Sequence, residues 1–170
     1  MKSARGFTLV ELLVVITILA ILSVIGIAAY SGVQKNARDT KRKTDFRSIK
    51  LALELYKQNN GKYPATDWVR STNNQPWIPG LDFNYMPNKV PQDPINTGGD
   101  PWNDTNGYRY SYWSLSCASF PEGQFFVLIV QLENKNDSDR NEIKDYRWCD
   151  GGGLRTTHGW SGTAYIVTSL

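Results

Sequence analysis

The chain has 170 residues, of which 41% are hydrophobic, and a formal net charge of +3. This length suits one domain with an appendage and excludes a large multidomain protein. Residues 31–59 carry eight Lys or Arg against three Asp or Glu, a net +5, whereas residues 60–170 carry nine against twelve, a net −3. The total charge therefore gives no ground for choosing a class of partner.

Residues 7–30 form an apolar run with one ionisable side chain, that of Glu11. As a helix the run would span about 36 Å, enough for a hydrocarbon layer of about 30 Å. A secretory signal peptide is disfavoured because its apolar core is usually only about 7–15 residues long. A plain membrane anchor is disfavoured because a lone charge is costly in lipid, and because basic residues after the run outnumber Lys2 and Arg5 before it.

A third interpretation accounts for the glutamate. The stretch RGFTLVELLVVITILAIL resembles the amino-terminal signature of type IV prepilins and of the related pseudopilins of type II secretion. Gly6, Phe7 and Glu11 match that signature, and the resemblance covers residues 1–30. It implies a leader peptide, residues 1–6, that prepilin peptidase removes between Gly6 and Phe7. It also implies methylation of the new amino terminus and a transmembrane, filament-core helix over residues 7–30.

The resemblance further implies an assembly role for Glu11. Cleavage creates an ammonium group on Phe7, and in lipid such a charge needs a partner. Glu11 is expected to pair with the amino terminus of a neighbouring subunit as the filament grows. The alternative is a glutamate paired within its own chain.

Residues 31–60 are predicted to continue the same helix. This stretch has no proline, and Phe46, Ile49, Leu53 and Tyr56 form an apolar stripe at helical spacing. The sequence NNG, with Gly61 as the carboxy-terminal cap, predicts where the helix ends. A helix from Phe7 to about residue 59 is too long to be buried by a head of about 110 residues. Its exposed part therefore requires other copies of the chain.

The basic run KNARDTKRK within this helix has two interpretations. It resembles a nucleic-acid patch, but nucleic acid is an unlikely partner beside a head with net negative charge. We favour a solvated helix face that meets anionic lipid headgroups or an acidic neighbour.

Residues 61–170 are predicted to form a globular α+β head. Prolines and turn signals indicate a long loop over residues 64–107. Strand patterns begin at Tyr108 and Gln124 and recur at the carboxy terminus, within a sheet region at residues 108–170, with a shorter strand at 146–149. The expected fold is a long amino-terminal helix packed on an antiparallel sheet of three or four strands. Three loop tryptophans could bind sugars or bases, but we expect them to hold the loop on the sheet: Trp68, Trp77 and Trp102.

The two cysteines, Cys117 and Cys149, lie in this head. We expect them to form a disulfide because the amino-terminal segment indicates export; in a cytosolic chain they would remain thiols. The single histidine, His158, stands beside Gly and Trp and is interpreted as a surface or packing residue. No phosphate loop, nucleophile elbow or zinc-type cluster is present in the sequence, and we expect no enzyme activity.

Calcium is the one cofactor that the sequence raises, and our expectation is that none is required. Asp137, Asp139 and Asn141 stand at alternate positions, as a calcium loop begins, but an EF-hand would then require Gly and Glu where Glu142 and Trp148 stand. Major pseudopilins, which this chain resembles, use a calcium in a head loop. Asp137, Asp139 and Asn141 are therefore weak candidates, as is the stretch 100–104, and a polar turn is the favoured interpretation.

We conclude that the sequence predicts a filament subunit, held in the cytoplasmic membrane by one span and then assembled into an extracellular or periplasmic homopolymer. The resemblance implies prepilin peptidase, an inner-membrane platform and a motor ATPase as partners. It leaves open whether the chain is a surface pilin or a secretion pseudopilin. The alternative is a membrane-anchored extracellular ligand-binding module.

Overall fold

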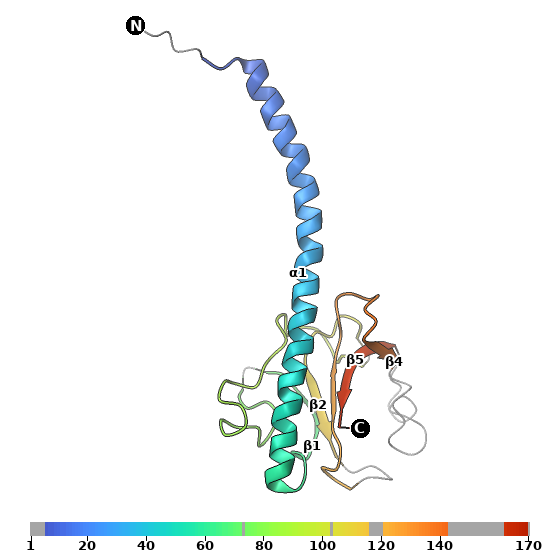
Figure 1. Cartoon of the computed structure of the whole chain (residues 1–170). Coiled ribbons are helices and arrows are strands. Elements are labelled where there is room, and N and C mark those ends of the chain that lie inside the picture. Colours follow the sequence, from blue (N-terminus) through green and yellow to red (C-terminus); the bar gives the residue numbers. More distant parts are fainter. Residues whose placement is uncertain (1–5, 73, 103, 116–120, 143–161, 170) are drawn as a thin grey trace. The chain divides into compact units, whose positions relative to one another are not determined.

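The structure is a computed structural model that describes residues 6–72, 74–102, 104–115, 121–142 and 162–169, without the side chains of residues 25–29 and 142. It contains one long helix, α1 (Leu9–Asn60), followed by a sheet (Figure 1). The chain divides into two units, Met1–Ala37 and Arg38–Leu170, and α1 contributes to both.

The helix α1 ends where the sequence predicts. The amide of Gly61 donates a hydrogen bond of 2.8 Å to the carbonyl of Lys57, and Gly61 has φ 75°. This left-handed conformation is the usual carboxy-terminal cap and favours glycine. The side-chain amide of Asn60 donates to the carbonyl of Tyr56 at 2.9 Å, satisfying another carbonyl of the last turn.

The described residues form a five-stranded antiparallel sheet in the order β1-β2-β3-β5-β4. β2, β3 and β5 confirm the predicted strands, whereas the sheet has more strands than the three or four expected. Tyr112 pairs with Leu128 across β2 and β3, and Leu128 pairs with Val167 across β3 and β5. The strands are β1 (Thr66–Arg70), β2 (Ser111–Ser114), β3 (Val127–Val130), β4 (Arg140–Glu142) and β5 (Thr163–Thr168).

Two strands were missed by the sequence analysis, and both lie at the edges of the sheet. β1 falls inside the predicted loop 64–107, and its pairing with β2 shifts register between Thr66 and Val69. β4 has the polar sequence RNE, which carries no apolar periodicity. Short edge strands gain little from burial and so leave a weak sequence signal. The strand predicted at 146–149 lies outside the described residues.

The core of the second unit lies between the helix and the sheet, as predicted. Phe46, Ile49 and Leu53 are fully buried, and Tyr56 packs against them in part. Figure 1 shows this part of α1 running beside the sheet. The facing residues come from β2, β3 and the segments just before them: Tyr110, Tyr112, Phe126, Leu128 and Val130.

Side chains that alternate with these form a second apolar cluster on the other face of the sheet. Trp113, Val127 and Ile129 belong to it, together with Trp102. All four residues of β3 are therefore buried, which explains why the sequence around them is continuously apolar rather than alternating.

Only part of the basic stretch of α1 is the solvated face that the sequence predicted, since Lys35 and Lys41 are exposed whereas Lys43 is half-buried. Arg42 is fully buried, and its guanidinium contacts three carboxylates. Its Nε and Nη2 donate to Asp93 at 2.6 and 3.0 Å, and its Nη1 donates to Asp39 at 2.7 Å and to Glu133 at 2.8 Å. We call these four residues the Arg42 cluster. From the sequence, we expected the basic run to meet lipid headgroups or an acidic neighbour. At Arg42 the acidic groups come from the same chain.

The carboxylates of the Arg42 cluster also bind backbone amides of the loops. Asp39 accepts hydrogen bonds from the amides of Glu133 and Asn134 at 3.0 and 2.8 Å. Asp93 accepts from the amides of Ile95 and Asn96 at 2.8 and 3.1 Å. One helical arginine therefore joins the loop after β3 to the long loop before β2.

Arg38 adds a second guanidinium to Glu133. Its Nε and Nη2 donate to the two oxygens of Glu133 at 2.7 and 2.6 Å. Burial alone would raise the pKa of Glu133, but the hydrogen bonds from Arg38 and Arg42 outweigh burial and lower it. The carboxylate is thereby held ionised.

We predict that Arg42→Met lowers the free energy of unfolding of the full chain by about 3–5 kcal/mol, because it leaves buried carboxylates without their counter-ion. Denaturant unfolding in detergent, followed by tryptophan fluorescence, measures the change. Arg47→Met, at an exposed position of the same helix, is the matched control. Equal stability of the two variants would contradict a central role for Arg42.

Candidate functional site at the amino terminus

The predicted cleavage site lies immediately before α1. Gly6 and Phe7 are outside the helix and exposed, with 85% of the Phe7 surface accessible. A Cβ placed on Gly6 would meet nothing within 4 Å. The peptide bond between the two residues is therefore open to an approaching enzyme.

Glu11 takes part in a reciprocal cap at the start of α1. Its Oε2 accepts hydrogen bonds from the amide and from the hydroxyl of Thr8, both at 2.8 Å. The Thr8 hydroxyl in turn accepts from the amide of Glu11 at 3.2 Å. This is a capping box, which satisfies amide groups that have no partner within the helix.

The capping box was missed by the sequence analysis, although its signal is present. Thr8 and Glu11 stand three residues apart in TLVE, directly before an apolar run, which is the pattern of a capping box. The hydrogen bonds between Thr8 and Glu11 are contacts within one chain, the arrangement considered above as the alternative for Glu11. The pairing of Glu11 with a neighbouring subunit stays a prediction.

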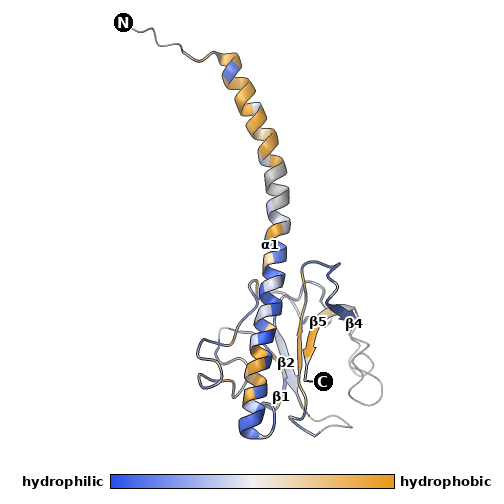
Figure 2. Ribbon diagram, viewed as in Figure 1, coloured by the Kyte–Doolittle hydropathy of each residue, from blue (hydrophilic) through white to orange (hydrophobic). Residues whose placement is uncertain are grey.

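The first turns of α1 expose aliphatic side chains on all sides, and Figure 2 shows this part of the helix as hydrophobic. The least exposed of these side chains, Val15, is 46% accessible. A continuous apolar surface of this kind marks a site of contact with protein or lipid. Its residues are Leu9, Val10, Leu12, Leu13, Val14, Val15, Ile16, Ile18, Leu19, Ile21, Leu22 and Val24. Among the described residues, no helix combines the length and apolarity needed to cross a membrane.

The predicted calcium ligands lie in the second unit and are engaged by other groups. Lys43 of α1 donates to the two oxygens of Asp137 at 2.7 and 2.9 Å and to Asp139 at 2.7 Å. The side-chain amide of Asn141 donates to the carbonyl of Asp139 at 3.1 Å. An ammonium group thus lies between the two carboxylates, and this arrangement does not fit a calcium site.

The second candidate stretch, residues 100–104, is likewise engaged internally. Asp100 forms an ion pair with Arg70. Asp104 accepts hydrogen bonds from the amides of Gly99 and Asn106, both at 2.8 Å. Within the described ranges, no three His, Cys, Asp or Glu residues are grouped so as to hold a metal ion.

The loop tryptophans pack as predicted. Trp77 is buried and its indole donates to the carbonyl of Pro91 at 2.8 Å. The ring of Trp68 lies 4.4 Å from that of Trp102 and 6.1 Å from that of Trp113, between ring centroids. These contacts hold the loop and β1 on the sheet.

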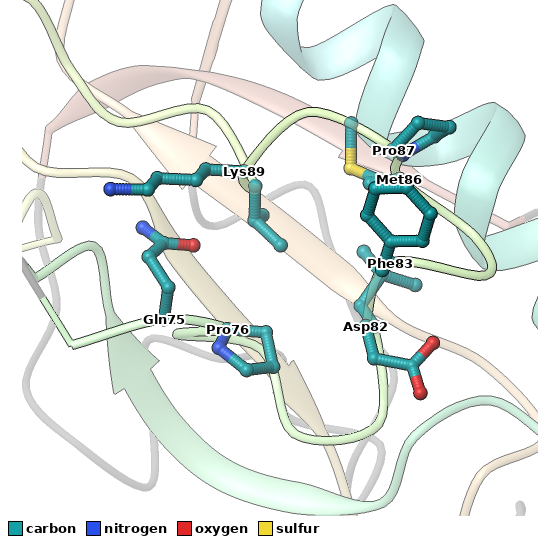
Figure 3. A pocket seen from close by; sticks show the side chains of 9 residues that line it. Gln75, Pro76, Asp82, Phe83, Met86, Pro87 and Lys89 are labelled. Atoms are coloured by element: carbon teal, nitrogen blue, oxygen red, sulfur yellow. The ribbon is translucent and has the colours of Figure 1, made fainter.

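A shallow pocket of about 190 Å³ opens in the same loop. Phe83 and Met86 lie on one side of it, with Gln75 and Lys89 on the other (Figure 3). A second pocket of about 390 Å³ shares Gln75 and Lys89. Neither is lined by the three tryptophans, so the predicted aromatic ligand site is not formed by either pocket.

The remaining predicted residues lie outside the described part of the chain. They are Cys117, Cys149 and His158. Their disulfide and packing roles stay predictions.

Comparison with known proteins agrees with the amino-terminal signature. The family model described as the prokaryotic N-terminal methylation motif matches residues 1–27. The type II secretion system core protein G of Pseudomonas aeruginosa is 32% identical over 152 residues, covering 86% of this chain and 96% of that protein. This chain belongs to the type II secretion system core protein G family. The predicted membership of the pilin and pseudopilin family is thus confirmed.

Other relatives carry the same name. Core protein G of Aeromonas hydrophila is 33% identical over 153 residues, covering 86% of this chain and 98% of the relative. That of Pectobacterium carotovorum is 34% identical over 122 residues, covering 69% and 78%. No solved structure matches the chain significantly. The likeness to the core protein G family therefore extends well beyond the amino-terminal signature into the head.

We predict that Thr8→Ala accelerates amide hydrogen exchange at Leu9–Leu12 by about threefold to tenfold, because loss of an amino-terminal cap costs about 1 kcal/mol. The measurement uses the full chain in detergent micelles. Thr17→Ala is the matched control, since the Thr17 hydroxyl donates only along the helix, to the carbonyl of Leu13 at 2.8 Å. Equal exchange of Leu9–Leu12 in both variants would contradict the capping role.

Proposed function

We propose that this chain is a structural subunit of a pilus-like filament of type II secretion and has no catalytic role. The observation that carries the proposal is the exposed aliphatic surface of the first turns of α1, placed directly after an accessible Gly6–Phe7 bond. Family membership favours the secretion branch over a surface pilin. The name of the relatives indicates type II secretion as the system in which the subunit acts. The exposed first turns of α1 provide the surface through which subunits assemble.

Processing comes first in this proposal. Prepilin peptidase cuts between Gly6 and Phe7 and methylates the amino group of Phe7. The capping box survives this cut, because the Thr8 amide belongs to the peptide bond between Phe7 and Thr8, which remains intact. The mature chain therefore begins with a charged residue followed by a helix that is already capped.

The exposed aliphatic residues first contact lipid and then other copies of the same helix. Residues 7–30 hold the subunit in the cytoplasmic membrane before assembly, and the filament then extends into the periplasm. Lipid is as apolar as leucine, so transfer from lipid to filament gains little from the hydrophobic effect. Close packing and matched charge must therefore decide where each subunit docks.

Glu11 and the amino group of Phe7 are the charges to be matched. An ionised carboxylate has two oxygens and can accept about four hydrogen bonds. The contacts with Thr8 both use Oε2, so the carboxylate retains the capacity to accept from the ammonium of a neighbouring Phe7. An unpaired charge in apolar surroundings is costly, which favours only the docking position that brings these groups together.

The partners in this proposal are other copies of the chain, prepilin peptidase, an inner-membrane platform and a motor ATPase. Nucleic acid is not expected as a partner. In the basic stretch of α1, Arg42 and Lys43 form ion pairs with carboxylates of the head, which leaves these two cations unavailable to phosphates. The alternative of a ligand-binding module is disfavoured, because the tryptophans expected to bind the ligand pack into the head.

We predict that the protein extracted from membranes lacks residues 1–6 and carries one added methyl group of about 14 Da. Intact-mass spectrometry measures both changes. Gly6→Val is expected to block the cut and preserve the full-length mass, while Gly32→Val, at an exposed glycine of α1, leaves processing unchanged. A wild-type chain that retains its first six residues would contradict the proposal.

We predict that Glu11→Ala abolishes filament formation, with at least a tenfold loss, a change that corresponds to about 1.4 kcal/mol or more in docking. Electron microscopy of filaments released from spheroplasts and quantitation of the membrane-bound pool measure it. The variant is still cut after Gly6, which separates assembly from processing. Glu122→Ala, at an exposed head position, is the control. Normal elongation of Glu11→Ala filaments would refute the assembly role.

A further inference from the structure

The loop between β3 and β4, Gln131–Asp139, is attached to α1 at two points. Near its start, the amides of Glu133 and Asn134 donate to Asp39 at 3.0 and 2.8 Å. Near its end, Asp137 and Asp139 accept from Lys43. Asp39 and Lys43 are four residues apart and so lie on one face of the helix. The helix therefore presents a carboxylate to one end of the loop and an ammonium to the other.

The ammonium of Lys43 lies where the acidic end of the loop would otherwise concentrate negative charge. Its three contacts with Asp137 and Asp139 measure between 2.7 and 2.9 Å. The side chain of Lys43 is only 18% exposed and that of Asp137 only 16%. Shielding from water strengthens this attraction relative to that of a surface ion pair.

Other oxygens of the loop are also engaged by protein donors. Arg140 donates through Nη1 to the carbonyl of Lys135 at 2.7 Å and through Nη2 to the side-chain oxygen of Gln131 at 3.3 Å. The amide of Asp139 donates to Asp137 at 2.9 Å. Calcium requires six to eight oxygen ligands, so it would have to displace several of these donors.

We propose that Lys43 is the built-in counter-cation of the loop Gln131–Asp139 and that this loop holds its structure without a divalent metal ion. The ammonium group of Lys43, on α1, supplies the positive charge that a calcium ion bound from solution would otherwise supply. This loop is thereby made independent of calcium, in contrast to the calcium-binding head loop of the major pseudopilins that the chain resembles.

The protonation of Lys43 agrees with this role. Burial acts to lower the pKa of Lys43, but the hydrogen bonds that it donates to Asp137 and Asp139, together with the attraction of their charges, outweigh burial and raise it. A raised pKa keeps the ammonium form at neutral pH, and the stabilisation it gives is lost only as the pH rises through that value. The counter-cation is therefore present under ordinary conditions.

Thermal unfolding of the full chain in detergent, followed by tryptophan fluorescence, tests the proposal in millimolar calcium chloride and in EGTA. We expect calcium to shift the midpoints of the wild type and of Asp137→Asn by the same amount, to within about 1 °C, because neither chain binds calcium at this loop. A calcium ion bound at a hundred times its dissociation constant would raise the midpoint by about 5–10 °C. A calcium-induced rise that is larger by that size in the wild type than in Asp137→Asn overturns the proposal.

Substitution of the lysine provides the second arm. Lys43→Gln removes the charge and is expected to lower the midpoint by about 4 °C or more in EGTA, whereas Lys43→Arg, which keeps a cation, restores most of the loss. Lys35→Gln, at an exposed position of the same helix, is the matched control and leaves the midpoint unchanged. A Lys43→Gln midpoint no lower than that of Lys35→Gln overturns the proposal as well.

Discussion

The fully buried guanidinium of Arg42 is the interaction on which the head depends. It lies on the same helix as the apolar stripe and contacts carboxylates from two separate loops, at Asp93 and Glu133. Burying a cation is costly unless carboxylates and hydrogen bonds compensate it fully, and here they do so with bidentate geometry at Asp93. The apolar stripe makes the helix adhere to the sheet, whereas the Arg42 cluster determines at which height along the helix each loop attaches.

The difference between the local apolar stripe and the long-range Arg42 cluster explains which parts of the fold could be predicted from the sequence. The helix was predicted to within two residues at its amino-terminal end and one at its carboxy-terminal end, because helix formers, the absence of proline and Gly61 all act locally. β2, β3 and β5 were predicted because apolar and aromatic periodicity reports burial. The burial of Arg42 was not predictable, because two of its three partners, Asp93 and Glu133, are 51 and 91 residues away in sequence.

The candidate sites show the same contrast between features that local sequence reveals and contacts between residues far apart in the chain. Gly6, Phe7 and Glu11 were predicted from a short signature, and the structure places Gly6 and Phe7 just before α1 and Glu11 in its first turn, all three exposed. The local role of Glu11 with Thr8 was readable from TLVE but was overlooked. By contrast, the lysine that contacts Asp137 and Asp139 lies more than ninety residues away from them in sequence, so the sequence alone left them as weak candidates for a metal site.

The outer strands of the sheet carry a consequence for a molecule that accumulates in many copies. An open sheet edge invites the edge of another molecule, and disordered aggregation follows when heads crowd together. Here β1 is interrupted by a register shift and ends at Arg70, while β4 is three polar residues long and begins at Arg140. Both borders are therefore poor templates for strand addition. Association of heads through their sheet edges is thereby disfavoured relative to the proposed assembly through the exposed aliphatic surface of α1.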